Sequence, residues 1–394
     1  MEEIDVLIAK RMGVHLYLSG VVGELLEFQN ALFESSVKTE LNSDLELFQA
    51  FCASDNMALK HSQHFIWSRL HDRKWDTVDP MWRMAYVVIT IRLVSGILQS
   101  KSFNLKQVLE EIDVALIIGG PFSELHEIAA LIHKLIDRCI VQDVQWSSSF
   151  ILKTNEGNAV TYKSTPSIPW FRENAMKIQE PHILLNTMDH WPALSKWKNM
   201  QYLLDLLAYR TVPVEVGFDY LDDSWSQKLM TFGEFALDYL LEDRKGYLAQ
   251  FELFDLVGSE LKRDIVIPDY CTLSLHSPSE LPVVSVNIWI GPAKTISRCH
   301  FDLKHNLLCQ VVGTKRIKII HPKYTDYLYP IGNTSGILDL DAPKEEIISD
   351  FPNYTHVVSQ DCVLQPGEML YIPPGFWHYV VAESFSISVS FWWD

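Results

Sequence analysis

Hydrophobic side chains recur at every third or fourth position through the first 145 residues of the chain. This is the spacing that gathers apolar side chains on one face of an α-helix. Asp79-Pro80 is typical of a helix start, and Gly119-Gly120-Pro121 of a break between helices. The spacing therefore predicts a helical N-terminal domain, a bundle, over residues 1–145. The clearest helical runs are 4–33, 81–98 and 105–140.

The pattern changes after residue 145. Residues 146–168 are rich in Ser, Asn, Gly and Pro, which is typical of a linker. Beyond it, short β-branched and aromatic runs predict strands, with Gly313-Thr314 as a hairpin turn. Many short strands predict a barrel or jelly roll over residues 169–394, so the expected fold class is α+β. The expected strands are 283–290, 306–312, 315–320, 368–372, 377–381 and 384–391.

Composition and charge narrow the classes of partner. Hydrophobic residues make up 48% of the chain and charged residues 21%, as in an ordinary folded protein. Fifty acidic residues against 33 basic ones give a net charge of −17, which argues against non-specific nucleic-acid binding. An acidic surface suits a basic protein segment, although solubility alone explains the charge equally well.

The cysteines and the N-terminus indicate in which cellular compartment the protein is expected. The six cysteines form no Cys-x-x-Cys pair, so we expect neither a zinc ribbon nor a disulfide framework. Residues 1–5 are acidic where a signal or transit peptide would be basic, and no apolar run is long enough to span a membrane. We expect an intracellular protein in the nucleus, the cytoplasm or both.

One histidine has metal-ligand spacing to an acid. Of the fourteen histidines, only His300 is followed two residues later by a carboxylate, that of Asp302. Residues two apart on a strand point to the same face, so both side chains can reach one ion inside a barrel. A His-x-Asp motif by itself is common by chance.

A second motif supplies a third ligand. Gly367 and Pro373 bracket a short strand, and the Pro-Pro-Gly corner that follows delivers His378 onto the next strand. Two histidines and one carboxylate leave coordination positions open, the arrangement that non-haem Fe(II) oxygenases use. Three alternatives stay open: barrel histidines without a metal, a metal cupin with His305 as fourth ligand, and a zinc hydrolase. The last lacks the His-Glu-x-x-His motif.

With these motifs the chain resembles the JmjC family of 2-oxoglutarate-dependent oxygenases from about residue 168 to the end. The resemblance rests on Asn-Ile-Trp-Ile-Gly-Pro at 287–292, His300-x-Asp302-x-x-x-Asn306, and segments 295–297, 310–313, 366–368, 377–380 and 388–393. It implies a double-stranded β-helix with Fe(II) held by His300, Asp302 and His378, and with 2-oxoglutarate and O₂ as co-substrates.

The resemblance also assigns a co-substrate site. Lys315 matches the cation that pairs with the distal carboxylate of 2-oxoglutarate, and Tyr247 matches a hydroxyl donor to the same group. Ser297 and Asn306 match polar residues that line the site. Apart from the resemblance, Lys315 would be read as a solvated hairpin lysine.

Further motifs are similar to one branch of the family, described as arginyl hydroxylases and lysine demethylases, with a claimed peptidase activity. In that branch Glu215, Trp225 and Trp289 match positions that hold a substrate side chain, although core packing is the alternative for each tryptophan. A carboxylate beside flat aromatic walls suits a guanidinium. The motifs are 212–217, 225–227, 229–231, 246–250, 267–271 and, in the helical part, 75–83.

The substrate expected from this resemblance is a basic protein or peptide, for example a histone or ribosomal one. Arginine C-hydroxylation is favoured over methyl-lysine demethylation because a close carboxylate matches the fork of a guanidinium. The chain shows no defensible Ser/His/Asp or Cys/His arrangement for a peptidase. Related small hydroxylases dimerise through a helical module after the barrel, which is missing here, so we expect a monomer.

Overall fold

A computed structural model shows the chain as two compact units. One contains Met1–Arg138, Tyr209–Thr211 and Asp255–Gly258, and the other contains the remaining residues. The expected helix at 4–33 lies outside the residues that the structure describes. Described are residues 56–71, 80–99, 104–120, 158–217, 226–242, 244–257, 259–275 and 281–394, with single residues 78, 129, 132, 133 and 136.

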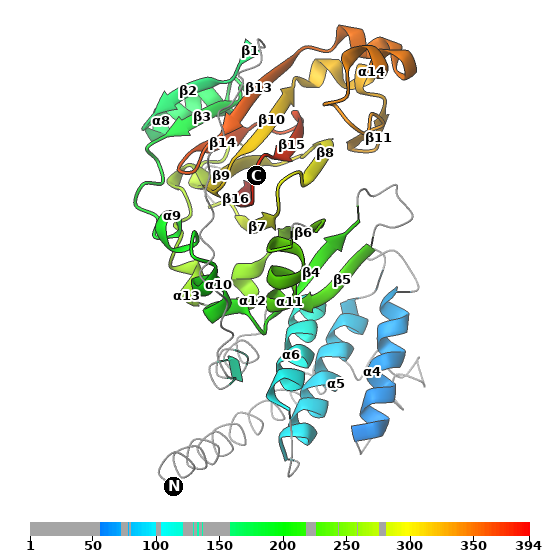
Figure 1. The fold of residues 1–394 in the computed structure, drawn as a ribbon. Helices are drawn as coiled ribbons and strands as arrows, with labels where there is room; N and C mark the ends of the chain where they lie inside the picture. Colours follow the sequence, from blue (N-terminus) through cyan, green and yellow to red (C-terminus); the bar gives the residue numbers. More distant parts are fainter. Residues whose placement is uncertain are drawn as a thin grey trace. The chain divides into compact units, whose positions relative to one another are not determined.

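The first unit contains three long helices, α4 (Asn56–His71), α5 (Pro80–Gln99) and α6 (Leu105–Gly119), coloured blue to cyan in Figure 1. Helix α5 packs against both of the others. Asn104 caps α6 by accepting a hydrogen bond from the Lys106 amide, and Gly120 ends it with φ 95°. The predicted start at Pro80 and the break at Gly119-Gly120 are confirmed.

A buried ion pair lies in this unit. Asp113 on α6 is fully buried and accepts hydrogen bonds from Arg210 Nε at 2.9 Å and Nη2 at 2.7 Å. The Thr211 amide donates to the same carboxylate at 2.7 Å, and Arg210 also donates to the carbonyl of Leu256. Segments far apart in sequence therefore complete the first unit.

Two sheets build the second unit (Figure 1). Successive strands alternate between the sheets from β7 to β10 and again from β13 to β16, and β10 to β13 all lie in the seven-stranded sheet. This arrangement is the one expected of a double-stranded β-helix. The seven-stranded sheet has the order β1 (Asn158–Ala159), β13 (Ser359–Leu364), β10 (Lys315–Ile320), β15 (Trp377–Ala382), β8 (Ile296–Phe301), β12 (Thr334–Ser335), β11 (Pro330–Ile331). The nine-stranded sheet has the order β2 (Thr161–Ser164), β3 (His182–Leu185), β14 (Met369–Ile372), β9 (His305–Val312), β16 (Ser386–Trp393), β7 (Ser285–Gly291), β6 (Gly246–Phe251), β4 (Thr211–Val216), β5 (Ser226–Thr231).

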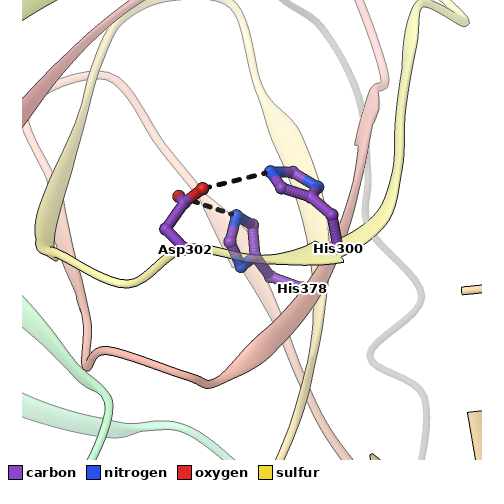
Figure 2. Close-up of side chains that lie close together, drawn as sticks. All are labelled: His300, Asp302 and His378. Atoms are coloured by element: carbon purple, nitrogen blue, oxygen red, sulfur yellow. Dashed lines mark ion pairs between the residues drawn. The ribbon is translucent and has the colours of Figure 1, made fainter. Parts of the chain in front are cut away.

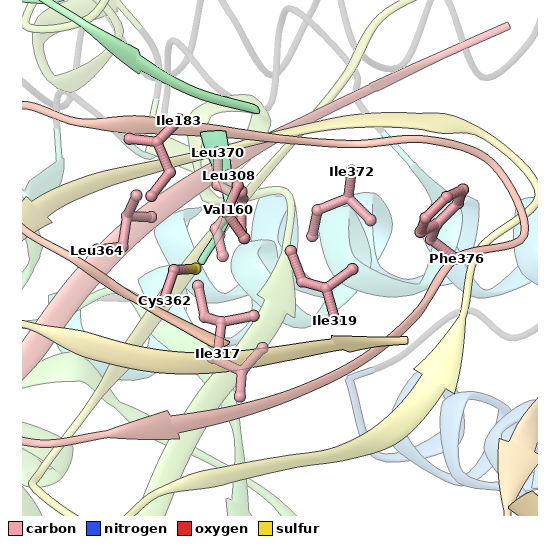
Figure 3. Close-up of a cluster of buried hydrophobic side chains, with 11 residues drawn as sticks. Val160, Ile183, Leu308, Ile317, Ile319, Cys362, Leu364, Leu370, Ile372 and Phe376 are labelled. Atoms are coloured by element: carbon pink, nitrogen blue, oxygen red, sulfur yellow. The ribbon is translucent and has the colours of Figure 1, made fainter. Parts of the chain in front are cut away.

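Apolar side chains from both sheets meet in a buried core (Figure 3). Leu308 and Leu370 come from one sheet and Ile317 and Val380 from the other. Burying a side chain of this size contributes about 1.5–3 kcal/mol. Some members of the core also line the pocket inside the barrel that contains polar side chains. Its members are Val160, Ile183, Leu308, Ile317, Ile319, Cys362, Leu364, Leu370, Ile372, Phe376 and Val380.

Short helices surround the sheets or fill the insertion between β10 and β13. Among the residues that the structure describes, no helix is long and apolar enough to cross a membrane. The helices before the insertion are α8 (Ile168–Phe171), η4 (Arg172–Met176), α9 (Ala193–Lys196), α10 (Met200–Leu207), α11 (Phe232–Phe235), η5 (Ala236–Leu240), α12 (Leu253–Val257), α13 (Ser259–Lys262) and η6 (Asp269–Thr272). Those of the insertion are η7 (Pro322–Leu328), α14 (Lys344–Asp350) and η8 (Pro352–His356).

The six strands expected from sequence are all present, with bounds shifted by two residues at most. The linker prediction was wrong for residues 158–164, which form β1 and β2. These strands pair in parallel with β13 and β3 at the sheet edges. Only Val160 between them is buried, so their polar, solvent-facing composition resembles that of a linker.

Candidate metal centre and adjoining pocket

Two neighbouring strands and one loop bring three ligand-type side chains together (Figure 2). His300 on β8 and His378 on β15 are direct antiparallel partners, and their ring centroids are 4.2 Å apart. Asp302 follows β8 immediately. Its Oδ1 lies 3.9 Å from His300 Nε2, and its Oδ2 lies 3.7 Å from His378 Nε2. The structure therefore brings together the three residues that sequence spacing selected.

Backbone carbonyls fix the tautomer of both imidazoles. His300 Nδ1 lies 2.7 Å from the carbonyl oxygen of Arg298, and His378 Nδ1 lies 3.1 Å from that of Phe376. A carbonyl can only accept, so each Nδ1 carries the proton and each Nε2 presents a lone pair. Both Nε2 atoms are the ones that face Asp302, and this orientation is the one that metal-binding histidines adopt.

The side chains of this cluster do not satisfy one another by hydrogen bonds or charge. Burial, with the neighbouring His300, lowers the pKa of His378 to about 3, so this ring is neutral. Burial raises the pKa of Asp302, while His300 and a hydrogen bond from Asn306 partly oppose that shift. Asp302 Oδ2 is buried without a hydrogen-bond partner. Two lone pairs and an unsatisfied carboxylate oxygen fit a divalent cation.

A pocket adjoins these ligands inside the barrel. His300 and His378 share it with Lys315 on β10 and Tyr247 on β6. The Lys315 ammonium is 2% exposed and donates to the Tyr247 hydroxyl at 3.2 Å. No carboxylate of the described residues lies within ion-pair distance of it. Burial lowers the pKa of Lys315 to about 7 and raises that of Tyr247. An unpaired buried cation fits an anionic ligand group.

A β-bulge explains how Ser297 reaches the same pocket. His378 pairs with His300, but Val380 pairs with Ser297, so β8 carries one extra residue at this point. Three residues apart on a regular strand, Ser297 and His300 would face opposite sides. The bulge lets both line the pocket, and Ser297 also forms a hydrogen bond with Tyr247 that partly opposes the rise in its pKa.

His305 does not belong to the cluster, and the expected fourth-ligand alternative therefore lacks support. His305 Nδ1 is hydrogen-bonded to the Tyr371 hydroxyl at 2.8 Å, and its ring stacks on Trp393. The next residue, Asn306, points the opposite way into the pocket. Among the described residues the ligand cluster has three members.

Comparison with known proteins identifies the family. Residues 169–394 match the model of the cupin-like domain, and residues 46–145 match the KDM8-like, N-terminal ARM repeats. Lysine-specific demethylase JMJ30 of Arabidopsis thaliana is 34% identical over 87% of this chain and 87% of its own length. Jumonji C domain-containing protein 5 of Drosophila melanogaster is 36% identical over 83% of this chain and 84% of its own. The chain belongs to the JmjC family.

Another JmjC relative, lysine-specific demethylase 8 of Xenopus tropicalis, is 43% identical over 58% of this chain. That match spans 51% of the relative's length. Membership places the chain among the 2-oxoglutarate-dependent oxygenases, and the ARM repeats account for the helical unit. The expected α+β fold, helices followed by a JmjC barrel, is confirmed.

A cleft of about 270 Å³ adjoins the pocket of this JmjC domain, and Tyr247 lines both. Glu215 on β4 is the direct cross-strand partner of Tyr247 and lines the cleft. Trp289 lines the pocket, with its ring 5.8 Å from that of Tyr247, and donates to Ser390 at 2.9 Å. Trp225 lies outside the described residues, so its role stays a prediction.

Other polar side chains of the JmjC barrel were missed from sequence. Ser388 donates to Gln310 at 2.7 Å, and Gln310 donates to the carbonyls of Val312 and Gly313. Ser390, two residues after Ser388 and on the same face of β16, lines the pocket. Trp392, farther along that face, lines the pocket beside Asn306. The alternation of Ser388, Ser390 and Trp392 along one strand was the signal that could have found them.

Proposed function

We propose that the chain is an Fe(II)- and 2-oxoglutarate-dependent hydroxylase of a cationic protein side chain, with arginine C-hydroxylation as its reaction. The observation that supports it most is one pocket lined by two residues of the three-member ligand cluster, His300 and His378, and by the unpaired buried ammonium of Lys315. A keto acid with a second carboxylate has the two anionic ends that such a pocket needs. When bound, Fe(II) and this keto acid supply the oxidation of a C–H bond by O₂.

The residues of the chain divide the remaining tasks. Nε2 of His300 and of His378, with the Asp302 carboxylate, would hold the metal, and their carbonyl partners keep the rings oriented. Lys315 and Tyr247 would hold the distal carboxylate. Lys315 must be protonated for this, and the arriving carboxylate raises its lowered pKa. Side chains of the apolar core that line the pocket limit its access to water.

The substrate assignment depends on the cleft beside Tyr247. Glu215 gives that cleft a carboxylate, and Trp289 gives the adjoining pocket a flat aromatic wall. A guanidinium pairs with a carboxylate in a planar fork and stacks on aromatic faces. The net charge of −17 also suits a basic protein substrate, such as a histone or a ribosomal protein.

Demethylation of methyl-lysine is the second candidate, because two of the relatives are named lysine-specific demethylases. The same hydroxylation at an N-methyl carbon would release the methyl group as formaldehyde. A methylated ammonium forms weaker hydrogen bonds with the Glu215 carboxylate than the fork of donors of a guanidinium does. The two reactions therefore differ in the carbon that is presented to the metal.

Mass spectrometry of peptides separates these candidates. The chain is incubated with Fe(II), 2-oxoglutarate, O₂ and matched peptides that carry either arginine or methyl-lysine. We expect one added oxygen on arginine, succinate in equal amount, and no product from His300→Ala. Glu215→Gln should raise the KM for the arginine peptide about tenfold, since it removes a charged hydrogen-bond partner. Loss of methyl from lysine without oxygen on arginine would overturn the arginine assignment.

A further inference from the structure

The most exposed large hydrophobic side chains belong mainly to the JmjC domain. Among the residues that the structure describes, they are Val283 (84%), Leu303 (82%), Leu281 (80%), Met57 (72%) and Ile331 (71%), and all except Met57 lie in that domain. Scattered exposed apolar residues are normal on any protein surface, whereas a group of them around one opening marks an interaction site. Their position relative to the ligand cluster therefore matters.

Ile331 lies on the same face of its sheet as the metal ligand His300. Thr334 on β12 is the direct antiparallel partner of His300 on one side and of Ile331 on the other. Directly paired residues point to the same face, so these three side chains follow one another from the ligand strand to β11, the edge strand of this sheet (Figure 1). Two strand spacings put the backbone of Ile331 about 10 Å from that of His300.

The hairpin that carries Ile331 is fixed to the ligand strand by its backbone. A two-residue turn, Gly332-Asn333, joins β11 to β12, and Gly332 has the positive φ of 65° that such turns require. The carbonyl of Asn333 accepts a hydrogen bond from the amide of Phe301 at 3.0 Å. Phe301 stands between the two ligands of the His-x-Asp motif. The distance of Ile331 from these ligands is therefore set by hydrogen-bonded backbone.

The remaining members of the group lie at the same end of the barrel. Leu303 directly follows the ligand Asp302. Trp392 is the direct partner both of the first residue of β7 and of Asn306 near the start of β9, so these two strands start together. Val283 lies two residues before β7. We name the four exposed residues at this end, Leu281, Val283, Leu303 and Ile331, the apolar rim.

The ligand cluster is open to solvent at the end where the rim lies. The side chains of His300 and Asp302 are each 24% exposed, although His378 is buried. A substrate can therefore approach the metal ligands from this side. No member of the rim carries a charge, so the rim does not attract a basic chain electrostatically. Removal of aliphatic surface from water is the driving force that it offers.

We propose that the apolar rim binds bulky aliphatic side chains of the protein substrate that are close in sequence to the oxidised residue. This inference takes the protein substrate from the proposed function. An extended chain advances about 3.3–3.6 Å per residue, so a side chain within about three residues of the target spans the distance from His300 to Ile331. Glu215 then selects the cationic side chain, and the rim selects its neighbours.

The test compares two peptides of equal length and charge that carry one arginine. One has leucine two residues away on each side, where side chains point to the same face as the target, and the other has serine there. Dissociation constants are measured by fluorescence anisotropy on the full chain loaded with Zn(II) and 2-oxoglutarate, so that no turnover occurs. We expect wild type to bind the leucine peptide about tenfold more tightly, since burial of aliphatic surface adds affinity.

Exposed positions provide matched variants. Ile331→Ser and Val283→Ser should each weaken the preference for leucine about threefold, because each removes one aliphatic contact. Met57→Ser is the control, since it replaces a similarly exposed residue of α4 and should leave the preference unchanged. None of these side chains is buried, so the melting temperatures of all three variants should equal that of wild type.

The outcomes separate the rim from the reaction. A preference that the rim variants weaken supports the rim even if the chain forms no succinate with Fe(II), a result that would refute the proposed function alone. Equal binding of the two peptides by a wild type that forms succinate would overturn the rim assignment. Sedimentation velocity gives the third outcome. A dimer that Ile331→Ser converts to monomers, with the peptide preference unchanged, would make the rim a contact between copies and also overturn it.

Discussion

Arg210 in the helical unit and Lys315 in the barrel are both buried cations, with 1% and 2% of their surface exposed. Arg210 is surrounded by acceptors: two carboxylate oxygens of Asp113 and the carbonyl of Leu256. Lys315 has a tyrosine hydroxyl and two aromatic rings near its ammonium, without an anion among the described residues. Burial costs each charge its hydration, but only Arg210 is compensated within the protein.

The difference separates structure from function. A buried charge with all its partners holds segments together, whereas a buried charge without an anion destabilises the ligand-free fold and remains useful only if a ligand completes it. The two buried carboxylates, Asp113 and Asp302, show the same difference. Asp113 is fully hydrogen-bonded, while Asp302 has a buried oxygen without a partner. Both uncompensated groups, Lys315 and Asp302, belong to the site where the co-substrate and the metal are proposed to bind.

The largest effect should come from breaking the compensated pair. Asp113→Ala leaves Arg210 buried and unpaired, so we expect the free energy of unfolding to fall by about 3–5 kcal/mol. Chemical denaturation measures it. Lys60→Ala is the control in the same unit, since Lys60 is half exposed and 3.8 Å from Glu111, and should cost at most about 1 kcal/mol. Equal losses in the two variants would remove the distinction between a buried and a surface pair.

Removing the uncompensated cation should act in the opposite direction on stability. Lys315→Met keeps the length of the side chain without its charge, so we expect a higher melting temperature for the ligand-free protein. Binding of 2-oxoglutarate should weaken about 100-fold, because a buried charged contact is lost. Lys318→Met on the same strand is the control. Lys318 is paired with Asp341 and Asp361, so its loss should leave co-substrate binding unchanged.

A smaller, graded effect should follow from pH. The pKa of Lys315 is about 7 in the ligand-free fold, against roughly 10.4 for an unfolded lysine. Between these values the unfolded chain binds more protons, so this residue makes stability rise with pH. Binding of the dicarboxylate requires the ammonium, so affinity should fall about tenfold per pH unit above 7. Calorimetry between roughly pH 6 and pH 9 measures the affinity for 2-oxoglutarate, and an affinity that does not change with pH in wild type would refute the role of Lys315.

Much of the fold could be predicted because it is local in sequence. Short β-branched and aromatic runs and the turn at Gly313 predicted the barrel strands. The spacing of His300 and Asp302 predicted that both side chains lie on one face. His378 followed from the Pro-Pro-Gly corner. Each of these depends on residues that are close along the chain.

The rest depends on contacts that no local pattern encodes. Lys315 meets Tyr247 across 68 residues of sequence, and Arg210 meets Asp113 across 97. Only the family resemblance pointed to Tyr247, and nothing pointed to Arg210. The bulge that turns Ser297 inward adds one residue to a strand without a mark in composition. The edge strands β1 and β2 look like a linker because the buried residue of this segment, Val160, lies between them and β2 itself has none.

Metal binding by the three-residue cluster is the most direct test of the central claim. Anaerobic titration with Fe(II), followed by 2-oxoglutarate, measures how many of each bind per chain. The proteins compared are wild type, Asp302→Ala and, as a control, His321→Ala, which removes a histidine outside the cluster. The account predicts one Fe(II) per chain and metal-dependent binding of one 2-oxoglutarate in wild type and His321→Ala, and neither in Asp302→Ala. Tight Fe(II) binding that survives in Asp302→Ala would contradict it.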